Sequence, residues 1–172
     1  MKPYKNKKVI FDLDKTIWNC FDKHKNEIWA KQLVPPFKLE SSGNVVDDVG
    51  NFCQLRSDVG YFVSEVNSRG IEISFLSVGA RLNLPMEFQP SYLLLKKFGL
   101  LNFFQGDNKL LYKTARKINF LSDDIFYIFI DDSESVLSDL ELKQNVLAID
   151  AKNITTWMGL IKKVDNVLNK ID

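Results

Sequence analysis

The segment Ile125 to Ile130 constrains the fold of this chain most, because all six of its residues are apolar or aromatic. A half-exposed strand would alternate apolar and polar residues, whereas this run suits a parallel strand covered on both faces. It ends directly at the carboxylates Asp131 and Asp132. A shorter apolar run, Val9 to Phe11, ends in the same way at Asp12. Ligands of open α/β sheets gather at the carboxyl ends of the strands, so this pattern predicts a site there.

Strand and helix patterns alternate along most of the chain. Further strands are expected at residues 71–76, 101–104 and 146–149. Helices are expected near residues 57–68, 91–98, 109–120, 134–140 and 154–168. Ser57 is a plausible N-cap for the first helix, and Gly70 and Gly99 are expected to stop the first and second. This order predicts an α/β fold, a three-layer, Rossmann-like parallel sheet with helices on both faces.

Residues 18–56 interrupt this alternation and are expected to form a projecting flap, part of it an irregular loop. The turn-forming sequence Ser41-Ser42-Gly43-Asn44 lies between two short apolar stretches, which predicts a hairpin. No second domain fits in the chain, so residues 1–172 are expected to form a single domain with this flap as an insertion at about 18–56.

Composition excludes several classes of protein. The 23 basic and 22 acidic residues nearly cancel, so no global positive field indicates a nucleic-acid binder. Apolar runs are too short for a membrane helix or a secretory signal, which favours a soluble, cytoplasmic protein with no membrane partner. Cys20 and Cys53 belong to no CxxC pair, and reduced thiols are expected rather than a disulfide. The oligomeric state is not specified, and a monomer is favoured.

The octapeptide Phe11 to Trp18 carries the clearest chemical motif. Side chains alternate along a strand, so Asp12 and Asp14 are expected on one face where the first strand ends, with Thr16 close by. Mg²⁺ takes oxygen ligands and commonly uses one or two carboxylates together with a substrate phosphate. The alternatives are a structural acidic turn and a calcium loop. The latter lacks the glycine and the glutamate that an EF-hand requires.

Two further groups extend this motif into a site. Ser77 ends the strand at 71–76, and Lys109 starts the expected helix that precedes Ile125. Taken singly, Ser77 would be a strand-end hydroxyl, Lys109 a solvated surface lysine, and Asp131-Asp132 a helix cap. Their joint occurrence in this order favours a functional site.

These residues resemble the four motifs of the haloacid dehalogenase superfamily of phosphohydrolases. Within it, the chain is most similar to the small, capless, magnesium-dependent acid phosphatase family over roughly residues 8 to 150. The similarity includes the octapeptide, Pro35-Pro36-Phe37 with the following Ser-Ser-Gly segment, Asn108-Lys109, and Phe129 to Asp132. It implies a Mg²⁺-dependent phosphatase with a short flap instead of a cap domain.

The resemblance also implies a role for each site residue. Asp12 would be the nucleophile that forms an aspartyl-phosphate, and Asp14 the general acid and base. Mg²⁺ would be bound by Asp12, by the backbone carbonyl of Asp14 and by Asp131, with Asp132 assisting. The remaining site residues would bind phosphate or orient the first-motif loop: Ser77, Lys109 and Thr16.

One position departs from the family pattern. An arginine usually follows the serine of the second motif, whereas Val78 follows Ser77 here, and Arg81 is the candidate replacement. Several flap residues could line the substrate path or pack the flap onto the core, among them Trp18, His24 and Phe37.

The open site leaves the substrate undecided. A phosphorylated protein (particularly one with phosphotyrosine) and a phosphorylated small molecule such as a sugar phosphate both fit. A nucleic-acid end phosphatase is an alternative, motivated by the basic stretch 109–117. A degenerate phosphatase fold that serves as a protein-binding module is another, motivated by Val78 and the altered loop after it.

Overall fold

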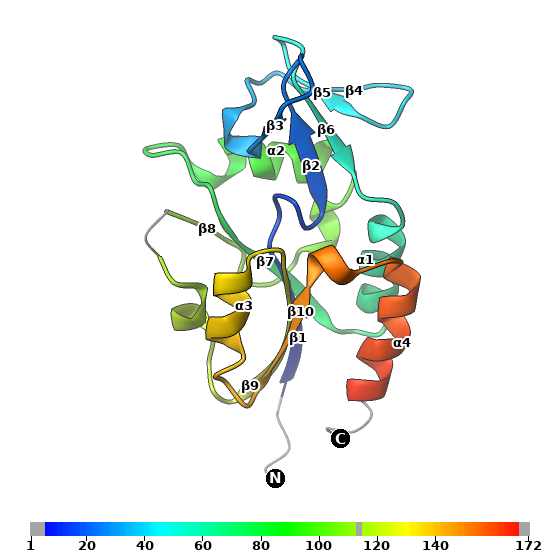
Figure 1. The fold of residues 1–172 in the computed structure, drawn as a ribbon, viewed down its shortest axis with the longest axis vertical. Helices are drawn as coiled ribbons and strands as arrows, with labels where there is room; N and C mark the ends of the chain where they lie inside the picture. The colour runs from blue at the N-terminus through cyan, green and yellow to red at the C-terminus, as the bar shows by residue number, and fades with distance from the viewer. Residues whose placement is uncertain (1–5, 113–114, 169–172) are drawn as a thin grey trace.

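A computed structural model describes residues 6–112 and 115–168 of the chain. Its main body is a five-stranded parallel sheet with the strand order β10-β9-β1-β7-β8 (Figure 1). The strands are β1 (Asn6–Phe11), β7 (Glu72–Val78), β8 (Lys109–Leu111), β9 (Ile125–Asp131) and β10 (Val146–Asp150). β1 is central and pairs with β9 on one side and with β7 on the other. The predicted parallel α/β sheet is therefore confirmed.

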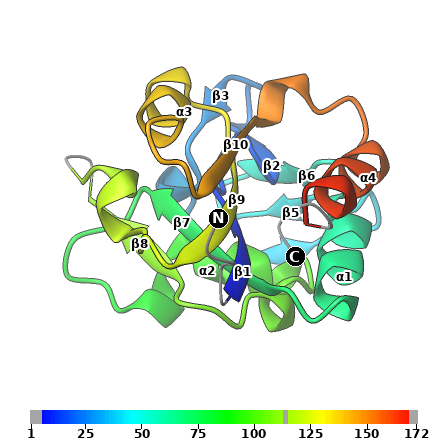
Figure 2. The same cartoon turned by 90° about the horizontal axis from the view of Figure 1, so that it is seen from below.

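Helices cover both faces of this sheet. They are α1 (Val59–Ser68), α3 (Glu134–Leu140) and α4 (Trp157–Leu168), while a fourth helix, α2 (Pro90–Lys97), packs against the flap residues Ala30–Gln32. Figure 2 shows α1 and α4 on one side of the sheet and α3 on the other. Successive residues of β1 serve different faces, because Val9 and Phe11 belong to the larger core cluster and Ile10 to the smaller one.

The flap, residues 18–56, folds into a second sheet. Its strands are β2 (Trp18–Phe21), β3 (Glu27–Ile28), β4 (Lys38–Leu39), β5 (Val45–Val46) and β6 (Phe52–Leu55), in the order β3-β2-β6-β5-β4. All pairs are antiparallel, and the predicted Ser41-to-Asn44 hairpin joins β4 to β5. Figure 1 shows this sheet above the carboxyl ends of the parallel strands. No cap domain is present among the residues that the structure describes.

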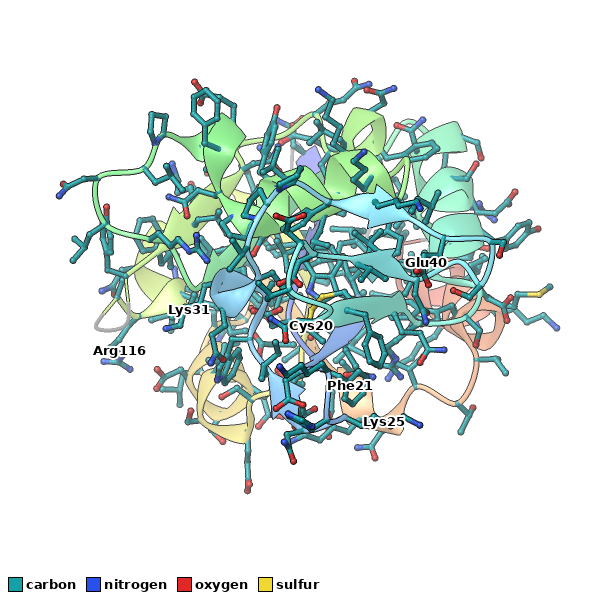
Figure 3. The ribbon with its side chains drawn as sticks, turned by 90° about the horizontal axis from the view of Figure 1, so that it is seen from above. Cys20, Phe21, Lys25, Lys31, Glu40 and Arg116 are labelled. Atoms are coloured by element: carbon teal, nitrogen blue, oxygen red, sulfur yellow. A yellow bond between two sulfur atoms is a disulfide. The ribbon has the colours of Figure 1, made fainter. Side chains whose placement is uncertain are left out.

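The flap also corrects the prediction of reduced thiols. Cys20 on β2 lies directly opposite Cys53 on β6, and the two side chains form a disulfide. Both cysteines are buried in the larger core cluster. Figure 3 shows Cys20 beside Phe21 in the sheet, seen from above. Their distance along the chain concealed this pairing, because strand register alone brings them together.

Three local predictions were wrong. The helix expected over 109–120 does not form in the part of this range that the structure describes: Lys109–Leu111 forms the edge strand β8, and a short 3-10 helix, η4, spans Lys117–Phe120. A short apolar run is compatible with a helix or with a strand, and here residues 109–111 form a strand because they pair with β7. Residues 101–104 contain the 3-10 helix η3 (Leu101–Phe103) rather than a strand. The residue that caps α1 is Asp58, whose φ is 63°, and not Ser57.

Of the other 3-10 helices in the described residues, two contain residues that contact the site. They are η1 (Ala30–Gln32), which lies in the flap, and η5 (Ala151–Asn153), which follows β10. A further one, η2 (Met86–Phe88), precedes α2. Within the described ranges, no helix has the length and apolar character needed to cross a membrane.

Candidate active site

The carboxyl ends of three neighbouring strands bring the predicted groups together. Asp12 follows β1, Ser77 lies near the end of β7, and Asp131 ends β9. The backbone N–H of Asp12 donates to the carbonyl of Ile130 at 2.8 Å, which continues the pairing of β1 with β9 up to the site. Since these strands are adjacent in the sheet, their terminal side chains converge although they are far apart in the sequence.

Asp12 is the centre of this group. Its Oδ1 accepts a hydrogen bond from Ser77 Oγ at 2.9 Å and another from Lys117 Nζ at 2.5 Å. Lys117 Nζ also donates to Asp131 Oδ2 at 2.6 Å. All four side chains are buried. A buried cation held between two carboxylates is stabilised only while both partners remain in place.

Lys117 corrects the prediction for Lys109. Lys109 lies on the edge strand β8, and its Nζ pairs with Asp107 near the surface, whereas the lysine that pairs with Asp12 is Lys117. Lys117 lies in η4, the turn that precedes strand β9, and this position brings it within reach of Asp131. The sequence contains one signal for this role, because Lys117 lies only a few residues before β9. The helix expected over 109–120 directed attention to Lys109 instead.

The pKa values of Asp12 and Lys117 are both raised, but by opposite causes. Burial raises the pKa of Asp12 from 3.8 to about 7, against a lowering by Lys117. Burial alone would lower the pKa of Lys117, but the carboxylates of Asp12 and Asp131 outweigh it and raise this pKa. Lys117 therefore stays charged throughout the physiological range.

Three carboxylates could hold a metal ion. Asp12, Asp131 and Asp132 each offer an oxygen, and these three oxygens lie within 4.8 Å of one another. The backbone N–H of Ser133 donates to Asp131 Oδ1 at 2.9 Å and helps to fix that side chain. Burial and the neighbouring Asp131 raise the pKa of Asp132, as expected for crowded carboxylates. This all-oxygen set fits a hard divalent cation.

Asp14 is held differently from the other site carboxylates. Its Oδ1 accepts from Trp18 Nε1 at 2.8 Å and from the backbone N–H of Ala30 at 3.1 Å. Burial raises the pKa of Asp14 to about 6, although both of these hydrogen bonds lower it. This carboxylate is not part of the three-oxygen cluster.

Thr16 and Arg56 shape the loop after β1. Thr16 is fully buried, and its Oγ1 has no hydrogen-bond partner among the described residues. The guanidinium of Arg56 donates from Nη1 to the carbonyl oxygens of Thr16 at 3.3 Å and of Ala151 at 2.8 Å. Arg56 thus ties this loop to η5. The sequence offered no motif that singles out Arg56, because its partners are backbone carbonyls.

The predicted flap residues lie in different surroundings. Trp18 and Phe37 are buried in the core cluster, so neither lines an open substrate path. His24 is exposed on the turn between β2 and β3, where its backbone N–H donates to Asp22. Of the other aromatic residues, Trp29 is 46% exposed, with Lys15 Nζ 5.1 Å from the centre of its ring.

Arg81 is directed toward the flap and not toward Asp12. Its Nε donates to the carbonyl of Lys31 at 2.7 Å, and its Nη2 to that of Leu33 at 2.6 Å. Its backbone is held in turn by the buried amide of Gln89. Arg81 therefore joins the loop after β7 to the flap, and the structure gives no support to it as the replacement arginine.

Comparison with known proteins agrees with this geometry. No curated protein matches the chain. The family model described as Acid Phosphatase matches residues 5–134, a segment that contains the Asp12 motif, Ser77, Lys117, Asp131 and Asp132. This match confirms the resemblance to the capless haloacid-dehalogenase-type acid phosphatases. The chain therefore belongs to the acid phosphatase family and is a phosphatase, a hydrolase of phosphoric monoesters.

Proposed function

We propose that this protein is a Mg²⁺-dependent phosphomonoester hydrolase that works through an aspartyl-phosphate on Asp12. The observation that carries the proposal is the buried Asp12 carboxylate, which receives hydrogen bonds from Lys117 and Ser77 next to the carboxylates of Asp131 and Asp132. A nucleophile, two donors for phosphoryl oxygens and an oxygen-rich metal site are the parts that phosphoryl transfer requires.

The metal and the phosphoryl group would be held by different residues. Asp12, Asp131 and the backbone carbonyl of Asp14 would bind Mg²⁺, with Asp132 assisting. When bound, Mg²⁺ offsets the repulsion between an anionic nucleophile and an anionic phosphate. Lys117, in place of the predicted Lys109, and Ser77 would bind phosphoryl oxygens, and the orphan hydroxyl of Thr16 would orient the loop.

The reaction has two steps. First, an Asp12 carboxylate oxygen attacks phosphorus, the bond from phosphorus to the leaving oxygen breaks, and Asp14 donates a proton to that oxygen. Second, Asp14 removes a proton from a water molecule, the water oxygen attacks phosphorus, and the bond from phosphorus to Asp12 breaks. The products are an alcohol or phenol and inorganic phosphate, and Asp12 and Asp14 return to their starting states.

The substrate class remains a phosphorylated protein, particularly one with phosphotyrosine, or a sugar phosphate. The nucleic-acid alternative gains no support from the basic stretch 109–117, because each cation of it that the structure describes (Lys109, Arg116 and Lys117) is paired with a carboxylate. The family match disfavours the degenerate binding module. The single domain, the monomeric state and the cytoplasmic localisation stay predictions.

The direct test is the hydrolysis of an aryl phosphate with and without Mg²⁺ by the wild-type protein and by Asp12→Asn. We expect Mg²⁺-dependent turnover that the substitution removes. Turnover by Asp12→Asn equal to that of the wild type would refute the nucleophile, and turnover unaffected by metal chelation would refute the metal requirement.

A second measurement tests the covalent step itself. Quenching the wild-type reaction with acid and analysing the intact protein by mass spectrometry should reveal one added phosphoryl group. Treatment with hydroxylamine should remove it, because acyl phosphates react with this nucleophile. A phosphoryl group that appears equally on Asp12→Asn would assign it to another residue.

A further inference from the structure

The carboxylate of Asp14 is held by the flap and not by the parallel sheet. Trp18 Nε1 at the start of β2 donates to Asp14 Oδ1 at 2.8 Å. The backbone N–H of Ala30, the first residue of η1, reaches both oxygens, at 3.1 Å to Oδ1 and 3.3 Å to Oδ2. All three residues are buried, so water does not compete for these bonds.

Both donors are fixed in place. Trp18 is fully buried, its ring stacks on that of Phe98 with 6.1 Å between centroids, and its backbone is paired with Leu55 on β6. Figure 1 shows β2 rising directly from the loop that follows β1. Ala30 is equally buried. Two rigid donors on one carboxylate leave it a single orientation.

The second oxygen of Asp14 lies near the loop that follows β7. A Cβ atom built on Gly79 would lie 4.0 Å from Asp14 Oδ2, and Gly79 follows Ser77 by two residues. Oδ1 therefore accepts the shorter hydrogen bonds from the flap, while Oδ2 lies toward the loop that follows Ser77.

We propose that Trp18 is a positioning residue: its indole N–H, together with the amide of Ala30, turns the Oδ2 atom of Asp14 toward the oxygen that leaves phosphorus. The flap thus takes part in acid–base catalysis rather than only covering the site. This inference rests on the proposed function, because it requires Asp14 to protonate the leaving group.

The leaving group provides a test that a structural role would not satisfy. An alkyl phosphate must release a strongly basic oxygen and depends on the proton from Asp14, whereas p-nitrophenyl phosphate releases a weakly basic one and depends on it little. kcat/KM reports the steps up to departure of the leaving group. Misplacing Asp14 should therefore lower kcat/KM for the alkyl substrate selectively.

The experiment compares both substrates with the wild-type protein and with Trp18→Phe, which keeps an aromatic ring and removes the N–H. We expect kcat/KM to fall about tenfold or more for the alkyl phosphate and less than about threefold for p-nitrophenyl phosphate. If Trp18→Phe does not fold, a tryptophan analogue with sulfur in place of the N–H at position 18 preserves the shape of the ring and gives the same comparison.

Two controls separate the possible causes. Phe98→Leu removes the stacking partner of Trp18 but leaves the N–H, and it should affect both substrates equally. Asp14→Asn should lower kcat/KM by about 10²-fold or more for the alkyl substrate. If Asp14→Asn shows no preference, the proposed acid is wrong. If it shows the preference while the loss of the Trp18 N–H lowers both substrates equally or neither, only the positioning role is overturned.

Discussion

Lys117 is the residue on which the charge balance of the site depends. Its ammonium group lies between Asp12 and Asp131, and its side chain is 4% exposed. Removing one member of a buried, hydrogen-bonded ion pair leaves an uncompensated charge, which commonly costs about 3–5 kcal/mol. Lys109, paired with Asp107, is 37% exposed, and pairs of that kind contribute about 0–1 kcal/mol.

Substitution of the two lysines by methionine should therefore have unequal results. Lys117→Met should lower kcat/KM for an aryl phosphate by about 10²-fold or more, as for other lost anion-stabilising donors, and should lower the free energy of unfolding. Lys109→Met serves as the matched control and should resemble the wild type in both. Kinetics and urea denaturation measure the two quantities. A larger kinetic loss in Lys109→Met would restore the original assignment.

At the scale of elements, the disulfide joins the two strands through which the chain enters and leaves the flap. Cys20 and Cys53 are 33 residues apart, and disulfides typically stabilise proteins by about 2–4 kcal/mol. Reductant should lower the free energy of unfolding of the wild type by about this amount and leave the double variant Cys20→Ala, Cys53→Ala unchanged. Two titratable thiols in the unreduced, unfolded wild type would contradict the bond.

The loop after β7 is a second link to the flap. Arg81→Ala removes two donors to backbone carbonyls and should lower the free energy of unfolding by about 1 kcal/mol or more. KM for an aryl phosphate should change less than about threefold, since Arg81 is not aimed at the phosphate. Gln89→Leu, which releases the same loop, is a control for stability. A rise in KM of tenfold with unchanged stability would assign phosphate binding to Arg81.

The sequence predicted elements well where burial dominates and poorly where pairing decides. Ile125 to Ile130 read correctly as a covered parallel strand, because its side chains alone specify that environment. Helix α3 was predicted with its observed bounds. Residues 109–111 form a strand because they pair with the edge of β7. Cys20 and Cys53 lie opposite each other because of the register between β2 and β6. Neither is a local property of the chain.

The same distinction holds for the site. Asp12, Ser77 and Asp131 lie directly after or at the end of strands, so their convergence followed from the parallel sheet. Asp14 lies in the loop after β1, and its carboxylate is held by hydrogen bonds from the flap. Lys117 lies in a short 3-10 helix outside the regular strand–helix pattern. Several other lysines and arginines lie nearby in the sequence, and no local pattern shows which of them is buried.

At the scale of the whole molecule, the buried carboxylates link folding to pH. The pKa values of Asp12 and Asp14 are raised from 3.8 to about 7 and about 6. At pH values between the ordinary pKa of 3.8 and these raised pKa values, the folded state therefore binds more protons than the unfolded state. For the metal-free protein, the free energy of unfolding should therefore decrease as pH rises from about 4 to about 7.

Mg²⁺ should reverse part of this loss. It binds the ionised carboxylates, so its stabilising effect should be larger near pH 7 than near pH 5. Thermal unfolding with chelator and with Mg²⁺ at both pH values measures this difference. Asp12→Asn combined with Asp14→Asn should flatten the dependence on pH. A metal-free protein whose stability rises over this range would contradict the linkage.

The central position of β1 has a consequence for how the enzyme is made. Residues 6–11 begin the sheet, yet their partner in β9 is residues 125–130, which leave the ribosome much later. Chains rich in such distant pairings fold slowly, because a long loop must close before the contacts form. The nucleophile, the lysine and the metal ligands can therefore meet only after most of the protein has been synthesised. A nascent chain that ends before β9 would carry an Asp12 with no site around it.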